Sequence, residues 1–108
     1  MATSTDGTHP STLEAAFRLA GLAVQSGTMT VDDLRHHTRQ GRPVLCPVAL
    51  YGGHWVVVRG VERGAVHYHC PAEGRQRATL SVWESIWQDS TRAGHDFDRW
   101  GIAVSPGG

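Results

Sequence analysis

The sequence contains neither lysine nor asparagine, and it has only two cysteines, Cys46 and Cys70. Two thiols cannot form a disulfide-rich scaffold, and a reducing cytosol would keep both of them free. All ten basic residues are arginines scattered along the chain, a composition typical of a GC-rich genome. The absence of lysine therefore indicates codon usage more than a physical requirement for arginine.

Long apolar runs and a surplus of charge are also missing. No run approaches the ~20 apolar residues of a membrane span, and the first ten residues have no basic or apolar stretch of a secretory signal. We therefore expect a cytoplasmic or virion location. Ten acidic residues balance ten basic ones, which argues against nucleic-acid binding. The 108 residues suit one globular domain, with 1–10 as an extension, 11–104 as the domain and 105–108 as a tail.

Hydrophobic periodicity predicts an α+β fold. A capping-box pattern at Ser11–Glu14 predicts a first helix that ends at Gly21, and Thr30 begins a second short helix that Gly41 stops. A second capping-box pattern at Ser81–Glu84 predicts a helix to about Asp89, with Val82 inward. Between and after them, period-two and valine-rich segments predict strands at 44–50, 54–61, 65–69, about 76–80 and 100–104. The prediction is an antiparallel β-meander packed with two to three helices.

His54 is the first candidate functional residue. It begins the second predicted strand, directly after Gly52 and Gly53. A histidine at the first position of a strand is well placed to act as a general base near neutral pH. The same position also suits a rim histidine that hydrogen-bonds a loop, so the local sequence leaves both interpretations open.

Three segments carry a family resemblance: GRPVL at 41–45, GHWVVVRGV at 53–61 and VHYHCPAEG at 66–74. Together they resemble the C-terminal half of the C39-like branch of the papain-like cysteine peptidases. In that family a Gly-x-Pro-Val strand leads to a histidine that begins a valine-rich strand, and the next strand ends in Asp-Pro followed closely by glycine. The resemblance covers about residues 11–104 and implies a papain-like domain.

The resemblance also implies roles for individual residues. His54 matches the family's base, and Cys70, before Pro71, stands where the family has the aspartate that orients this base. A thiol does not supply the fixed negative charge of that carboxylate. The family's nucleophile is a cysteine at the start of a helix, and the first predicted helix, with Ser11 and Thr12 at its start, has none.

Neither cysteine is an obvious replacement for that nucleophile. If residues 51–53 form the hairpin turn, Cys46 faces Val58, about 13 Å along the strand from His54, and acts as a small core hydrophobe. Cys70 lies nearer the correct end of the sheet but in the position of the orienting residue. We therefore predict that neither cysteine forms a nucleophilic pair with His54, while an unorthodox Cys70–His54 pair stays an alternative.

A metal site is a further alternative. Strand alternation places His67 and His69 on one face, Cys70 follows at the bend, and His54 could complete a zinc site. No Cys-x-x-Cys or His-x-x-x-His spacing supports it.

Trp83 and Trp87 are four residues apart on the predicted last helix, so they share a face. They either close the small core or form an interface patch. Because a spacing of four is not expected to bury both rings in so small a domain, the interface interpretation predicts that this face contacts another chain.

Three functions are compatible with these residues. The first is a catalytically incomplete C39-like domain that works as a binding or structural component of a larger assembly, such as a phage particle. The second is an active cysteine peptidase or acyl-transfer enzyme that uses His54 with Cys70 or with a cysteine of another subunit. A cysteine sulfur within about 4 Å of a His54 ring nitrogen would favour the second. The third is a small metal-binding domain. We expect protein partners or a homo-oligomer, no nucleic acid, no membrane and no cofactor.

Overall fold

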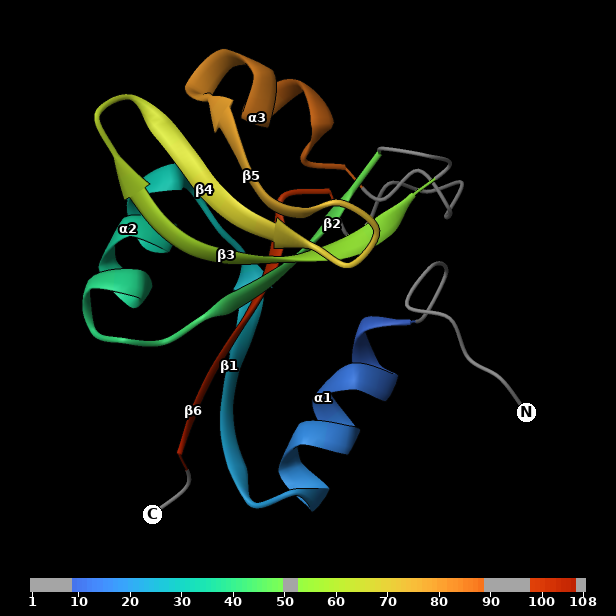
Figure 1. Cartoon of the computed structure of the whole chain (residues 1–108). Coiled ribbons are helices and arrows are strands. Elements are labelled where there is room, and N and C mark those ends of the chain that lie inside the picture. Colours follow the sequence, from blue (N-terminus) through green and yellow to red (C-terminus); the bar gives the residue numbers. More distant parts are fainter. Residues whose placement is uncertain (1–8, 50–52, 89–97, 107–108) are drawn as a thin grey trace.

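A computed structural model describes residues 9–49, 53–88 and 98–106 (Figure 1). These residues form the helices α1 (Pro10–Leu19), α2 (Val31–Arg39) and α3 (Leu80–Ile86), and the strands β1 (Leu22–Thr28), β2 (Val44–Val48), β3 (His54–Glu62), β4 (Ala65–Cys70), β5 (Gly74–Thr79) and β6 (Trp100–Pro106). The fold is α+β, as predicted. Of the described helices, none has the length and apolar character needed to cross a membrane.

The strands form one antiparallel sheet in the order β1-β6-β2-β3-β4-β5. Strands β2 to β5 are the predicted meander, and β3 lies between β2 and β4. The prediction that His54 begins an interior strand is therefore confirmed. In Figure 1, α1 lies below the rest of the sheet beside β1, and α3 lies above β5.

Strand β1 was not predicted. It alternates half-buried residues such as Leu22 and Val24 with exposed ones, and it pairs along its whole length with β6. Its alanine, glutamine, serine and glycine have low β-propensity, so the local signal is weak, and pairing with β6 overrides it. The same pairing extends β6 to Pro106, opposite Leu22, into the segment expected as a tail.

Two of the three predicted helix starts are wrong by one or two residues. Helix α1 begins at Pro10, and the His9 side chain, not Ser11, caps it by accepting from the Ser11 backbone N–H at 3.1 Å. Proline suits this first position because its missing N–H would have had no partner within the helix. Helix α3 follows β5 directly, with Thr79 as its cap instead of Ser81. The helix ends at Ile86, and the predicted end near Asp89 lies outside the described residues.

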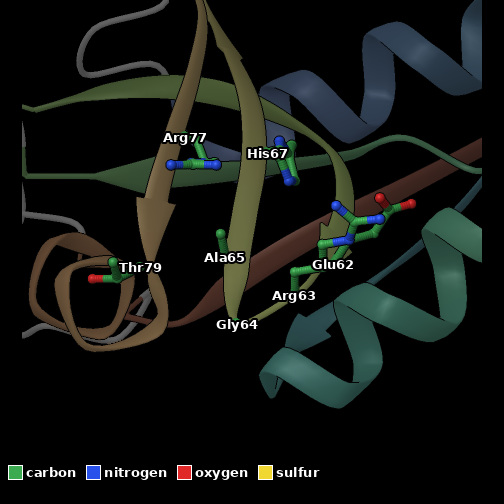
Figure 2. Close-up of a pocket in the computed structure, with 7 residues that line it drawn as sticks. All are labelled: Glu62, Arg63, Gly64, Ala65, His67, Arg77 and Thr79. Atoms are coloured by element: carbon green, nitrogen blue, oxygen red, sulfur yellow. The ribbon is translucent and has the colours of Figure 1, made fainter.

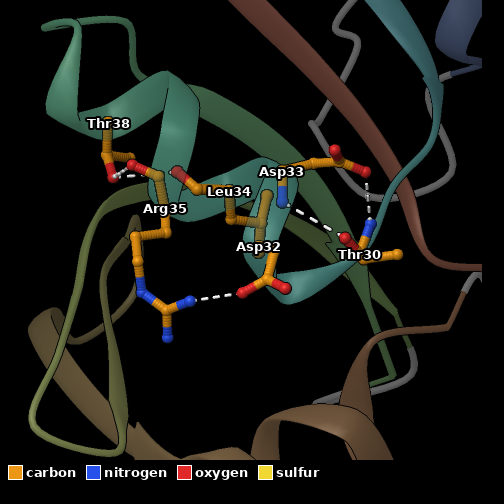
Figure 3. A network of polar contacts seen from close by, with 6 residues as sticks. All are labelled: Thr30, Asp32, Asp33, Leu34, Arg35 and Thr38. Carbon is orange, nitrogen blue, oxygen red and sulfur yellow. Dashed lines mark hydrogen bonds and ion pairs between the residues drawn. The ribbon is translucent and has the colours of Figure 1, made fainter.

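Helix α2 has the predicted start. The Thr30 hydroxyl accepts a hydrogen bond from the Asp33 backbone N–H at 3.2 Å, and the Asp33 carboxylate accepts one from the Thr30 N–H at 2.8 Å (Figure 3). Asp32 pairs with Arg35 one turn further along the same helix. Acidic side chains in a first turn also offset the positive end of the helix dipole.

The sheet has an apolar cluster on each face. One cluster contains Trp55, Ile102 and Val104 with side chains of α1 and β1 packed against them, and the larger one, beneath α2 and α3, includes Trp83 and Trp87. Both indoles are 0% exposed, so the prediction that one spacing of four could not bury both rings is wrong. Trp83 therefore faces inward, whereas Val82, predicted to be inward, is 49% exposed.

His37 is a buried histidine whose environment favours the neutral ring. It lies on α2, and the Arg42 Nε donates to its Nδ1 at 3.1 Å. Burial lowers the pKa of His37 below its ordinary value of 6.5, nearby Arg42 and His36 lower it further, and Asp33 opposes them. The folded protein therefore binds this proton less readily than the unfolded chain does.

This difference predicts a loss of stability in mild acid. As pH falls below about 6.5, the unfolded chain takes up the proton first, and the free energy of unfolding decreases by at most about 1.4 kcal/mol per pH unit from this group. The His37→Gln variant keeps an acceptor for Arg42 and removes the titration. We expect urea midpoints at pH 7.5 and 5.5 to differ less in the variant than in the unmodified protein. An equal difference in both would contradict this assignment.

Candidate functional site

The centre of the candidate site is a contact between His54 and Cys70. The Cys70 Sγ lies 3.3 Å from the His54 Nε2, within reach of a hydrogen bond that involves a sulfur atom. Both residues are buried, with His54 8% and Cys70 2% exposed. This contact meets the distance criterion of about 4 Å that favours the second of the three functions, whereas the absence of a nucleophilic cysteine stays a prediction.

The register of the sheet produces this contact. His69 pairs with Val57, so the next residue, Cys70, lies near the start of β3, and both Cys70 and His54 point to the face beneath α2 and α3. Cys70 ends β4 just before Pro71, which cannot donate a ladder hydrogen bond. The thiol thus occupies the place beside the imidazole that the resemblance assigns to an orienting carboxylate.

Cys46 lies closer to His54 than predicted, but it is not part of the site. It pairs with Val56, and Val48 pairs with His54, so two residues separate Cys46 from His54 along the strand instead of four. The connection between β2 and β3 covers residues 49–53, which is longer than the turn assumed from the sequence. Cys46 is 0% exposed, and burial raises the pKa of its thiol well above the ordinary value. It is a core residue, as expected.

Tyr68 is a further neighbour of Cys70 on β4. The two residues are two positions apart on β4, so they face the same side of the sheet, and the Tyr68 ring packs 5.5 Å from that of Trp83. Burial raises the pKa of the Tyr68 hydroxyl, and charge on Cys70 adds to this effect. The Tyr68 hydroxyl therefore stays protonated near the thiol. The spacing of two residues between Tyr68 and Cys70 was the sequence signal that could have predicted that both face the same side of the sheet.

The proposed zinc ligands do not come together. His67 and His69 lie on the opposite face of β4 from Cys70, because alternate strand residues point to opposite faces, and Cys70 is turned inward against His54. Within residues 9–49, 53–88 and 98–106, no three histidine, cysteine, aspartate or glutamate side chains form a group that could hold a metal ion. The structure therefore contradicts the ligand set of His67, His69 and Cys70.

The fold defines a class of protein. The structure resembles the peptidase domain of Streptococcus mutans ComA solved in complex with a small-molecule inhibitor, with a TM-score of 0.72 and 15% identity over 96% of this chain and 80% of that one. A second structure of the ComA peptidase domain gives a TM-score of 0.71 at 17% identity, covering 97% of this chain and 80% of that one. The fold is thus that of the C39-like, papain-like peptidases.

The sequence identifies the family more directly. Residues 2–88 match the family model described as the papain-like cysteine protease AvrRpt2, Peptidase C70. The chain belongs to this family of papain-like cysteine proteases. A periplasmic domain of the EpsAB fusion protein of the Vibrio vulnificus type II secretion system is a more distant structural neighbour, with a TM-score of 0.59 and 17% identity over 95% of this chain and 48% of that one. Comparison with curated proteins gives no match.

Proposed function

We propose that these 108 residues form a catalytically incomplete papain-like domain, which works by binding as a component of a larger assembly. The observation that carries the proposal is the burial of both cysteines in the sequence: Cys46 is 0% and Cys70 is 2% exposed. A cysteine peptidase needs a thiolate that reaches a carbonyl carbon of its substrate, at about 3–3.5 Å. Neither sulfur is presented to a substrate in this way.

The position of Cys70 supports the same conclusion. Its sulfur lies against the His54 Nε2 in the place of the orienting residue, so it holds the imidazole rather than facing outward from it. Cys46 is further excluded because burial raises its thiol pKa and so disfavours the reactive thiolate. The domain keeps the sheet and the base of the family without an accessible nucleophile among these residues.

The 3.3 Å contact also favours a second candidate function, an acyl-transfer enzyme in which His54 activates Cys70. It satisfies the distance criterion for a thiol–imidazole pair. This candidate requires a movement that exposes Cys70 to a substrate, because the thiol is 2% exposed. The two candidates therefore differ in whether Cys70 is reactive in the folded protein.

Alkylation with iodoacetamide at neutral pH separates them. In the Cys46→Ala variant Cys70 is the sole thiol, and we expect it to react at least about a hundredfold more slowly in the folded protein than in urea, because burial limits access. Adding His54→Ala or His54→Gln is expected not to slow the reaction. Fast, stoichiometric labelling of the folded protein that both His54 substitutions abolish would overturn the proposal and establish the enzyme.

A further inference from the structure

The face of the sheet that carries α1 is covered over only part of its width. Leu13 and Phe17 of α1 pack against Trp55, Ile102 and Val104, in the half formed by β1, β6, β2 and the start of β3. In the other half, the side chains of β4 and β5 that point to this same face are largely exposed. Four of them are basic or imidazole side chains: His67, His69, Arg75 and Arg77.

Strand register gathers these four side chains into two cross-strand pairs. His67 lies opposite Arg77, and His69 lies opposite Arg75. Figure 2 shows His67 and Arg77 side by side on their neighbouring strands. Arg59 joins them from the bulge in β3, where the register with β4 shifts. We call these five residues the basic face: Arg59, His67, His69, Arg75 and Arg77.

The basic face has no internal compensation. In the described part of the chain, none of the ion pairs involves Arg59, Arg75 or Arg77, so three guanidinium groups lie on this face without a carboxylate partner. The whole chain has a formal net charge of zero, so the basic face is a local concentration and not a consequence of a basic protein. An anionic partner would relieve the repulsion between its members.

The surface of the basic face contains two hollows. One, of about 280 Å³, is lined by Glu62, Arg63, Gly64, Ala65, His67, Arg77 and Thr79 (Figure 2). The other, of about 330 Å³, is lined by Arg59, His67, Tyr68, Arg75 and Gln76. His67 borders both hollows, so they lie on either side of this residue.

We propose that the basic face binds an extended acidic peptide segment of a partner protein. The inference rests on the proposed binding function, and it names the chemistry of the partner. Arg75 and Arg77 are two residues apart on β5, and carboxylates on every second residue of an extended peptide repeat at the same spacing, about 6.7 Å. Each guanidinium can bind a carboxylate through two parallel hydrogen bonds.

The position of β5 suits such a segment. It is the last strand of the sheet, with a neighbour on one side only, so an extended peptide can add along it by backbone hydrogen bonds. Side chains at alternate positions of the added strand would then lie on the same face as Arg75 and Arg77.

A single-stranded nucleic acid fits the basic face less well. Its bases bind by stacking on exposed aromatic side chains, and the large hydrophobic side chains exposed in the described residues are Leu19 and Val82, neither of them aromatic. The observations therefore favour a peptide whose acidic residues alternate with neutral ones.

Fluorescence anisotropy with a labelled (Glu-Thr)4 peptide tests the proposal at about 50 mM salt, where charge screening is weak. We expect saturable binding that the Arg75→Gln/Arg77→Gln double variant weakens by at least about tenfold. The matched control is Arg18→Gln/Arg39→Gln, which removes two exposed arginines from α1 and α2, and it should leave the affinity within about twofold.

Absence of saturable binding, or equal weakening by both double variants, overturns the inference. Tighter binding of a (dT)12 oligonucleotide that the Arg75→Gln/Arg77→Gln variant abolishes also overturns it and assigns the basic face to nucleic acid. The alkylation of Cys70 is read out separately in the same proteins. Failure of peptide binding with an unreactive Cys70 therefore rejects this inference alone, whereas a reactive Cys70 rejects the proposed function.

Discussion

Replacing Trp87 with alanine is expected to lower the free energy of unfolding by about 3–5 kcal/mol, the range for removing a buried indole. The Trp87 side chain is 0% exposed, and its ring lies 5.5 Å from that of Trp83. Its Nε1 donates a hydrogen bond to the Trp100 carbonyl at 3.0 Å, which ties the end of α3 to β6. The substitution removes this bond and leaves a cavity between the helix and the sheet. Denaturant titration followed by circular dichroism measures the change.

Two control variants separate the contribution of burial from that of the Trp87 hydrogen bond. Val82→Ala, on the same helix but at a 49% exposed position, should cost less than about 1 kcal/mol. Trp87→Phe keeps most of the apolar surface but removes the hydrogen bond to the Trp100 carbonyl, which contributes about 0.5–1.5 kcal/mol. Sedimentation at two protein concentrations shows whether association changes as well. A small loss of stability accompanied by dissociation of an oligomer would contradict the burial of this ring and restore the interface interpretation.

The second large effect is expected at Gly101 in β6, where a single methyl group has no room. An alanine Cβ would lie 2.4 Å from the Met29 Sδ and 3.0 Å from the Val44 Cγ1. Met29 is itself 6% exposed and packed in the larger cluster, so its sulfur cannot simply move into solvent. We expect Gly101→Ala to lower the free energy of unfolding by about 1–3 kcal/mol, the usual cost of overpacking.

A double-mutant cycle identifies the cause of this loss. Met29→Ala alone should cost about 2–5 kcal/mol, but in the double variant the new methyl group occupies part of the vacated space. The combined loss should therefore be smaller than the sum of the two by at least about 0.5 kcal/mol. Gly60→Ala in β3 is the matched control, because a Cβ there meets nothing within 4 Å. Additive effects of the two substitutions would show that Met29 is not the obstacle.

The parts of the fold that the sequence predicted depend on interactions between neighbours along the chain. Thr30 and Asp33 form the capping box that starts α2, since both hydrogen bonds join residues three apart. The valine-rich run after His54 forms an interior strand because its residues favour a pleated, buried surface. The start of α3 was predicted two residues late, because both Thr79 and Ser81 can cap a helix. The choice between them depends on where the preceding strand β5 ends.

The candidate site could be predicted only in part. The family resemblance placed His54 and Cys70 in neighbouring roles, but the register of β2 against β3 was wrong by two residues. A slip of one residue would turn every apolar side chain to the other face, whereas a slip of two preserves the faces and leaves no trace in the alternation. The alternation pattern alone therefore could not give the distance from Cys46 to His54.

The sequence by itself determined the α+β class, the meander, helix α2 and the candidate base His54, because periodicity and capping act over a few residues. The tertiary structure alone decided that Cys70 contacts His54, that β1 pairs with β6, that Trp83 and Trp87 are both buried, and that scattered arginines meet histidines on one face. Each of these depends on the register or packing of segments far apart in the chain. Such contacts are fixed by loop lengths and by how the apolar faces of whole elements fit together, which no short stretch of sequence encodes.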